Sequence, residues 1–221
     1  MEPDAVEIRV VGCLVEKQRT TPDAYPLSLN ALRLACNQST NRDPVVSYDE
    51  ATVVEALRRL ALRGWTRLAS GAGSRARKYR HLLPEALGVD DEELVLLAVL
   101  MLRGPQTPGE LKGRSERLYR FDGLPAVQER LERLVEREFV VRHPRRPGQK
   151  EDRFEQVLGG QEGSEDAPSP AEPTHAEEEQ GVEAATSTRT SPEDRLERIE
   201  GELASLREEL ARLREALGEG G

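Results

Sequence analysis

The chain has 221 residues, of which 37% are hydrophobic and 33% are charged, and its net charge is −9. This length suits one or two modest domains, and the high charged fraction indicates that part of the chain stays outside a packed core. The sequence shows neither a signal peptide nor an apolar run near the roughly 18 residues of a membrane span. We therefore expect a cytoplasmic protein without membrane contact.

The acidic residues are concentrated near the C-terminus. Residues 1–89 carry 13 Lys and Arg against 10 Asp and Glu, residues 90–158 carry 13 against 14, and residues 159–221 carry 6 against 17. The first two segments are therefore near neutral, with local basic clusters. Only four of the 32 basic residues are Lys. The abundant Arg suits phosphate and base recognition, but a GC-rich genome explains it equally well.

The first 158 residues repeat one pattern twice. An amphipathic helix with one apolar stripe is predicted over residues 4–18, and a second helix over residues 90–103, where Asp90 is a candidate N-cap. Both helices run into a Thr-Pro dipeptide, at Thr21 and at Thr107, so the two copies align with an offset of 86 positions.

The offset falls to 74 at the next predicted helix, where VVEALRRLALRGW from Val53 aligns with VQERLERLVEREF from Val127. In each copy a short β-like run, a basic turn and a second β-like run follow. The order of helix, short helix, helix and hairpin predicts a winged helix-turn-helix. We therefore expect a mainly α (α+β) fold with two tandem winged-helix domains, at residues 1–89 and 90–158.

The change of offset gives the first copy 12 additional residues between Pro22 and Val53. The polar stretch CNQSTNRDPV, residues 36–45, lies inside this insertion. Such side chains can read base edges, since Asn and Gln pair with adenine and Arg with guanine. On this interpretation an exposed loop presents Asn37, Gln38, Asn41 and Arg42.

The same stretch can instead form helix caps and turns. Asn37 then ends a helix in the left-handed conformation, Asn41 and Asp43 form turns, and Ser47 caps the next helix. Caps and turns explain each residue singly. They explain less well why so many polar groups crowd one insertion.

Both predicted hairpins are basic, at the same place in each copy. The first carries Arg75, Arg77, Lys78 and Arg80, and the second carries Arg145, Arg146 and Lys150. In winged helices the hairpin commonly lies along the phosphate backbone, which suits Arg and Lys. A solvated hairpin whose charges discourage edge-to-edge pairing explains them equally well.

The third predicted helix of each copy mixes acids with Arg. In the second copy its polar positions are Glu129, Arg130, Glu132, Arg133, Glu136 and Arg137. Alternating signs are typical of a solvated face with pairs three or four residues apart. Acids facing phosphate weaken DNA binding, so this pattern argues against tight DNA binding by the second copy. It is also the strongest evidence against DNA binding by the whole protein.

The sequence contains no pattern typical of catalysis or metal binding. His81, His143 and His175 are scattered, and Cys13 and Cys36 form no C-x-x-C motif. No Gly-rich phosphate loop follows a predicted strand, and no nucleophile is paired with a base. We therefore predict a protein that is not an enzyme, with no cofactor and no metal site.

Beyond Leu158 the composition changes. Residues 159–190 are rich in Gly, Pro, Glu and Ser, which predicts a disordered acidic linker. Residues 191–218 have unbroken heptads and predict a coiled-coil helix that pairs in parallel with other copies, as a dimer or a trimer. The alternative is a helix that packs on its own chain. The predicted contact positions are Leu196, Ile199, Leu203, Leu206, Leu210, Leu213 and Leu217.

The stretches GCLVEKQRTTPDAYPLSLNALRLACNQSTNRDPV, RKYRH and LRGPQTPGEL resemble the YceH family of uncharacterised bacterial proteins. The resemblance covers residues 5–158. It implies two winged-helix domains, in agreement with the repeat, and it implies no established activity. Family members tend to have Lys where this chain has Ser39, so any phosphate contact of that Lys is missing here.

These features predict an oligomeric tandem winged-helix protein that binds DNA, in gene regulation or chromosome function. The alternative is a protein-protein interaction scaffold, which the mixed charges of the third helices and the acidic linker favour. The two differ in their dependence on salt, because binding to phosphate weakens steeply with ionic strength and an apolar interface does not.

Overall fold

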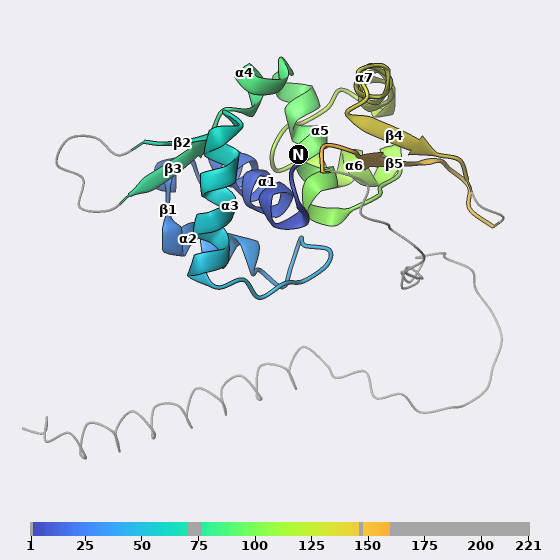
Figure 1. Ribbon diagram of the computed structural model, residues 1–221. Coiled ribbons are helices and arrows are strands. Elements are labelled where there is room, and N and C mark those ends of the chain that lie inside the picture. Colours follow the sequence, from blue (N-terminus) through green and yellow to red (C-terminus); the bar gives the residue numbers. More distant parts are fainter. Residues whose placement is uncertain (1, 70–76, 146–147, 160–221) are drawn as a thin grey trace, which may run out of the picture. The chain divides into compact units, whose positions relative to one another are not determined.

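The computed structural model describes residues 2–69, 77–145 and 148–159 (Figure 1). Within these ranges the fold is mixed α and β, with seven α-helices, one 3-10 helix and two small antiparallel sheets. The predicted acidic linker, apart from its first residue, and the predicted coiled coil lie outside the described residues. No helix in the described part is both long and apolar enough to cross a membrane.

The first half, residues 2–89, combines a helical layer with a three-stranded sheet of order β1-β3-β2. Its elements are α1 (Ala5–Thr20), η1 (Pro22–Ala24), β1 (Leu27–Ser28), α2 (Leu29–Cys36), α3 (Glu50–Leu62), β2 (Thr66–Leu68), β3 (Lys78–His81) and α4 (Leu83–Leu87). Both pairings are antiparallel, with Leu27 opposite Tyr79 and Thr66 opposite His81. The 3-10 helix η1, the strand β1 and the short helix α4 were not predicted.

The second half, residues 90–159, repeats the order with fewer elements. They are α5 (Asp91–Arg103), α6 (Pro108–Ser115), α7 (Leu124–Glu136), β4 (Val140–His143) and β5 (Arg153–Gln156). Strands β4 and β5 pair antiparallel, and a single bridge from Gln106 to Phe154 stands where β1 stands in the first half. Both halves therefore have the predicted order, which is compatible with winged-helix units. The predicted N-cap is also confirmed, since Asp90 accepts from the Glu93 N–H at 2.8 Å.

The 12 additional residues of the first half are divided between two places. The N-caps of matching helices lie 86, 79 and 74 positions apart, at Asp4 and Asp90, Ser28 and Thr107, and Asp49 and Gly123. Seven extra residues therefore precede α2 and five lie between α2 and α3. The predicted match of Thr21 with Thr107 was wrong beyond the first helix, because Thr21 precedes the 3-10 turn η1 whereas Thr107 caps α6.

Helices α1 and α5 lie side by side and join the two halves (Figure 1). Ten consecutive residues of each helix are buried, Glu7–Glu16 in α1 and Glu93–Leu102 in α5. The single apolar stripe predicted for α1 is therefore wrong, because the second half covers its other side. Gly12 lies at this contact, where an added Cβ would lie 3.1 Å from the Cβ of Met101.

A buried glutamate ties the start of α1 to α3. Asp4 and Glu7 form a capping box, and the side chain of Glu7 is only 2% exposed. The Nε atoms of Arg59 and Arg63 lie 3.4 and 3.2 Å from its two carboxylate oxygens. Arg59 of α3 and Arg63, the C-cap of α3, therefore bind at the N-terminus of α1, where the positive end of the helix dipole also favours the carboxylate.

The second half repeats this arrangement. Asp90 and Glu93 form the capping box of α5, and the Glu93 side chain is 1% exposed. Arg133 Nε and Arg137 Nη1 lie 3.2 and 3.4 Å from its oxygens. The sequence repeat thus preserves a buried ion network as well as the apolar positions. Arg133 of α7 and Arg137, the C-cap of α7, are thus tied to the start of α5.

His81 fastens the hairpin to α1. Its Nε2 lies 2.6 Å from Oε1 of Gln18, and its Nδ1 accepts from the Leu83 N–H at 3.4 Å. A neutral ring with its proton on Nε2 satisfies both contacts, whereas a protonated ring loses the acceptor at Nδ1. Burial lowers the pKa of His81 to about 4.

We predict that Glu93→Gln lowers the free energy of unfolding by about 1–3 kcal/mol, because it removes the charge that two arginines share and one carboxylate acceptor. Urea denaturation followed by circular dichroism measures the change. Glu129→Gln is the matched control on an exposed position of α7 and should leave stability nearly unchanged. Equal stability of Glu93→Gln and the wild type would show that the network contributes nothing.

Stability should also decrease as pH falls from about 6.5 toward 4. The unfolded chain binds a proton at the ordinary histidine pKa, whereas folded His81 stays neutral down to about 4. Between these values the unfolded state holds more protons, so acid favours unfolding. Urea denaturation at several pH values measures the free energy of unfolding, which should change less with pH in His81→Gln than in the wild type. The same dependence on pH in both proteins would contradict the assignment.

Candidate functional site

Arg42, predicted to be exposed in a polar loop, is buried. Arg42 is only 6% exposed, and its guanidinium forms an ion pair with Glu16 of α1 at 2.6 Å. All its N–H groups are used: Nε donates to the Ala35 carbonyl at 3.0 Å, and the two Nη atoms donate to Glu16, the Asn41 carbonyl and Gln38. The expected exposure of Arg42 is therefore wrong. A contact with guanine requires breaking this network.

The rest of the α2–α3 loop (residues 37–49) is also held by hydrogen bonds. The Asn37 amide pairs with the backbone of Tyr48 in both directions, at 2.8 Å each. Gln38 accepts from Arg42 at 2.9 Å. Caps and turns thus account for these side chains, although at other positions than predicted. Asn41 has the positive φ (61°) expected of Asn37, and Asp49 caps α3 in place of Ser47.

The α2–α3 loop also contacts the second half. The Asp43 N–H donates to the carbonyl of Leu102 at 2.8 Å, and Arg103 Nη2 donates to the Asn41 side chain. On its other side the loop is bound by Arg9 of α1, which donates to the Pro44 carbonyl at 2.8 Å. The insertion that the second copy lacks therefore bridges the two halves.

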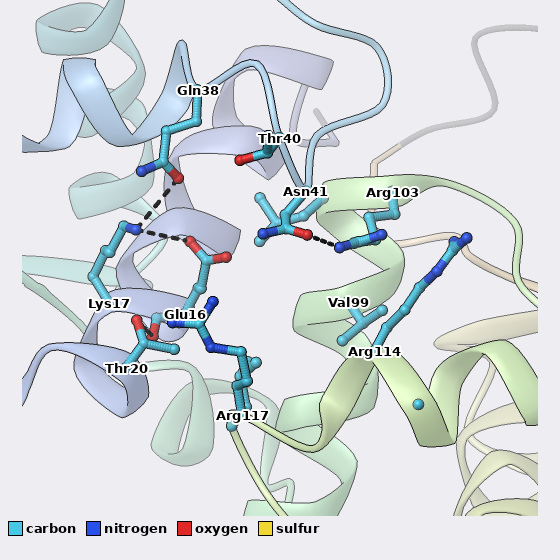
Figure 2. Close-up of a pocket in the computed structure, with 13 residues that line it drawn as sticks. Glu16, Lys17, Thr20, Gln38, Thr40, Asn41, Val99, Arg103, Arg114 and Arg117 are labelled. Carbon is cyan, nitrogen blue, oxygen red and sulfur yellow. Dashed lines mark hydrogen bonds and ion pairs between the residues drawn. The ribbon is translucent and has the colours of Figure 1, made fainter. Parts of the chain in front are cut away.

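A pocket of about 420 Å³ lies beneath this loop, with walls from both halves. Figure 2 shows Glu16 and Lys17 of α1 on one side, Arg103 and Arg114 on the other, and the loop above. The lining residues are Glu16, Lys17, Thr20, Gln38, Thr40, Asn41, Val99, Leu102, Arg103, Gly113, Arg114, Arg117 and Leu118. Gln38, Thr40 and Asn41 among them belong to the polar stretch of residues 36–45. No local pattern indicates the others, since the pocket forms only when α1 packs against α5.

Glu16 is the carboxylate that lines this pocket. Burial acts to raise its pKa, but hydrogen bonds and charge from Arg42 and Lys17 outweigh burial and hold the pKa below the ordinary value. Lys17 Nζ lies 3.5 Å from the carboxylate and donates to Gln38 Oε1 at 3.3 Å. The negative charge of Glu16 is thus shared by two neighbouring cations.

The first hairpin (β2 and β3) presents a basic face. Arg67 lies directly opposite Arg80 in the register, and Lys78, two residues before Arg80, shares its face. Arg67 was not among the predicted residues, whereas Lys78 and Arg80 were. Arg77 is exposed just before β3, and Arg75 lies outside the described residues.

Residues 66–81 contain neither Asp nor Glu, so no acid of the first hairpin itself lies beside Arg67 and Arg80. Like charges directly opposite each other on a sheet are destabilising. The Nε of Arg80 is also buried without a hydrogen-bond partner among the described residues. This face therefore has the properties of a surface that accepts an anion.

The second hairpin (β4 and β5) is neutralised by acids. Arg142 pairs with Glu132 of α7 and lies 4.0 Å from Asp152, and His143 Nε2 lies 2.8 Å from Glu155. Two predicted residues, Arg145 and Lys150, line an open hollow of about 590 Å³ together with acids. Those acids are Glu132, Glu151 and Asp152. Arg146 lies outside the described residues. The two hairpins, similar in sequence, thus differ in surface charge.

The outer faces of α3 and α7 differ in the same way. On α3 the exposed side chains include Val54 and Leu62, which are 45% and 78% exposed. Arg58 is exposed beside them and pairs with Glu55 at 2.7 Å. The matching positions of α7, 74 residues later, are Gln128, Glu129, Glu132 and Glu136. The outer face of α7 is therefore acidic, and that of α3 is apolar with one ion pair.

We predict that Arg42→Met lowers the free energy of unfolding by about 3 kcal/mol or more, because it leaves the buried Glu16 without its main partner. Urea denaturation measures the loss. The double variant Arg42→Met with Glu16→Gln should recover part of it, since no buried charge remains. Arg58→Met, which removes an exposed arginine, serves as the control. Wild-type stability of Arg42→Met would contradict the structural role.

Comparison with known proteins identifies the family. Residues 4–149 match the family described as "Protein of unknown function, DUF480". A UPF0502 protein of Geotalea daltonii is 52% identical over 169 residues, which cover 75% of this chain and 77% of the relative. A UPF0502 protein of Pseudomonas fluorescens is 42% identical over 222 residues, which cover 96% and 94%. The resemblance to the YceH family is thereby confirmed, and the chain belongs to the DUF480/UPF0502 family, of which YceH is a member.

Proposed function

We propose that this protein binds DNA, without catalysis and in the cytoplasm, through the basic face of its first hairpin. The observation that carries the proposal is the direct cross-strand pair of Arg67 and Arg80, with Lys78 on the same face. The repulsion between Arg67 and Arg80 is offset when phosphates lie against them. Gene regulation and chromosome organisation are the processes such binding can serve.

In this proposal each half is a winged helix-turn-helix. The order of three helices followed by a hairpin supports this, as does the short strand β1, which adds to the hairpin of the first half. In such units the third helix approaches the groove and the hairpin lies along the phosphates. The first half is then the DNA-contacting half. The acidic outer face of α7 repels phosphate and suits another role for the second half.

The α2–α3 loop has a supporting part in this proposal. Its Asn37 and Arg42 hold the loop and are not assigned to bases, because their hydrogen bonds are already made within the protein. The predicted contacts of Arg145 and Lys150 are likewise not retained, because both lie among acids. The proposed DNA contacts therefore involve fewer residues than were predicted from the sequence.

A protein-interaction scaffold is the second candidate. Large apolar side chains are exposed on the first half: Leu34 (54%), Val45 (59%), Val54 (45%), Leu62 (78%) and Leu68 (53%). Such side chains are commoner at protein interfaces than at phosphate contacts. Parallel self-association through residues 191–218 stays a prediction and is compatible with either function.

Fluorescence anisotropy of a mixed-sequence DNA duplex, from about 50 to about 200 mM salt, tests the proposal. One variant changes three cations of the first hairpin to Gln, at Arg67, Lys78 and Arg80. The matched control changes three cations of the second hairpin, at Arg142, Arg145 and Lys150. Removing a cation that binds a phosphate should reduce the salt slope by about one, so the first variant should bind weakly and with a shallow slope.

The control variant should bind DNA nearly as the wild type does, although it has the same reduction in net charge. Circular dichroism of both variants establishes that they are folded. If both variants lose the same DNA affinity, the change in net charge explains the loss, and the first hairpin is not a specific binding face. If the wild type does not bind DNA at the lowest salt, the DNA-binding proposal is contradicted and the protein-interaction scaffold becomes the favoured function.

A further inference from the structure

We propose that Cys13 and Cys36 form a buried redox site, at which hydrogen peroxide oxidises the two thiols to a disulfide that links α1 to the end of α2. Cys13 lies in α1, and Cys36 is the last residue of α2. Both are free thiols, and both are fully buried. The site shares no residue with the basic face of the first hairpin, and the inference does not depend on DNA binding.

The packing of α1 against α2 brings the two thiols together, although they are 23 positions apart in the sequence. The Nε of Arg42 donates at 3.0 Å to the carbonyl of Ala35, which precedes Cys36. Its Nη2 donates at 2.6 Å to Glu16, which follows Cys13 by three positions and shares its face of α1. The Cys36 thiol is close enough to donate a hydrogen bond to the sulfur of Cys13. Sulfur atoms in contact can form a disulfide with little movement of the backbone.

The buried cations around the thiols exceed the buried carboxylates. Arg42 pairs with Glu16. Arg9, one turn before Cys13 on α1, is also buried, with 4% exposure. Its Nη2 donates to the Pro44 carbonyl, whereas its Nη1 is buried without a hydrogen-bond partner among the described residues. No carboxylate in the described part of the chain pairs with Arg9. An unpaired buried charge is strongly unfavourable, and a thiolate at Cys13 supplies the negative charge that this cation lacks.

The surroundings change the acidity of the two thiols in opposite directions. Burial acts to raise the pKa of Cys13. The hydrogen bond from the Cys36 thiol and the charges of the two arginines outweigh burial and the nearby carboxylate, so this pKa lies below its ordinary value. The pKa of Cys36 is raised by its neighbour Cys13 and by burial. Because the thiolate is the nucleophile in thiol chemistry, Cys13 attacks the peroxide and Cys36 completes the disulfide.

The oxidation takes place in two steps. The sulfur of the Cys13 thiolate attacks one oxygen of hydrogen peroxide, so an S–O bond forms, the O–O bond breaks and hydroxide leaves, which takes a proton from solvent. The product is a sulfenic acid. The sulfur of Cys36 then attacks the sulfur of Cys13, the S–O bond breaks, and the Cys36 proton leaves with the hydroxyl group as water. The two thiols lose two electrons, which reduce one peroxide to two molecules of water.

Mass spectrometry of the full chain treated with hydrogen peroxide tests the site. We expect the folded wild type to lose both free thiols, and peptide mapping without reductant to find Cys13 joined to Cys36 within one chain. Dithiothreitol should restore both thiols. This result needs no variant.

Two variants test the separate roles of the thiols. Cys36→Ser should stop at the sulfenic acid of Cys13, which dimedone traps. In Cys13→Ser, the remaining thiol of Cys36 should react with peroxide at least about tenfold more slowly, because its raised pKa keeps it protonated. Equal rates in the two variants would contradict the assignment of Cys13 as the nucleophile.

The ultraviolet absorbance of the thiolate tests the charge of Cys13 without any oxidant. At neutral pH the wild type should show the absorbance of a thiolate, which Cys13→Ser should lack. Arg9→Met should decrease this absorbance, because it removes the buried cation that favours the thiolate. Arg58→Met, which removes an exposed arginine, is the matched control and should retain the absorbance. Circular dichroism checks that each variant is folded.

Three results would overturn the inference. The first is survival of both thiols in the folded wild type under a peroxide treatment that oxidises them in the urea-unfolded chain. The second is disulfide formation only between chains, because thiols in contact pair within one chain. The third is equal thiolate absorbance in the wild type and Cys13→Ser, because Cys13 then carries no negative charge.

Discussion

The buried ion pair between Arg42 and Glu16 organises the region where the two halves meet. Every N–H group of the guanidinium is used, on α1, on the end of α2 and on the α2–α3 loop. This fixes a loop that would otherwise have little apolar surface to bury. The fixed loop then reaches the second half through the Asp43 N–H and the side chain of Asn41, and it forms one wall of the pocket.

A second set of ion pairs ties two arginines of each half to the start of its first helix. In each half a buried capping-box glutamate, Glu7 or Glu93, binds two arginines of the third helix. Since this network is the same in both halves, the halves differ only at positions outside it. There the first half carries a basic hairpin and an apolar α3 face, whereas the second carries acids on α7 and beside its hairpin. Two copies of one fold thus present different surfaces.

Local patterns in the sequence were enough to predict the order of elements, the Asp90 cap and the tandem repeat, because helix caps and apolar periodicity act between near neighbours. Arg42 could not be placed in this way, since its partner Glu16 is 26 positions away and the pairing depends on how α1 and α2 pack. The basic face was recognised in part, through Lys78 and Arg80. Arg67 was missed because only the register of β2 on β3 places it opposite Arg80. The pocket was missed altogether, because its walls meet only when the halves pack.

The central claim is that the first hairpin, and not the second, meets DNA. The most direct measurement follows backbone amide NMR signals of the full chain while a short mixed-sequence duplex is added. The account predicts that signals of β2 and β3 shift progressively and saturate, while those of β4 and β5 stay in place. Shifts confined to β4, β5 and α7, or no shifts at low salt, would contradict it.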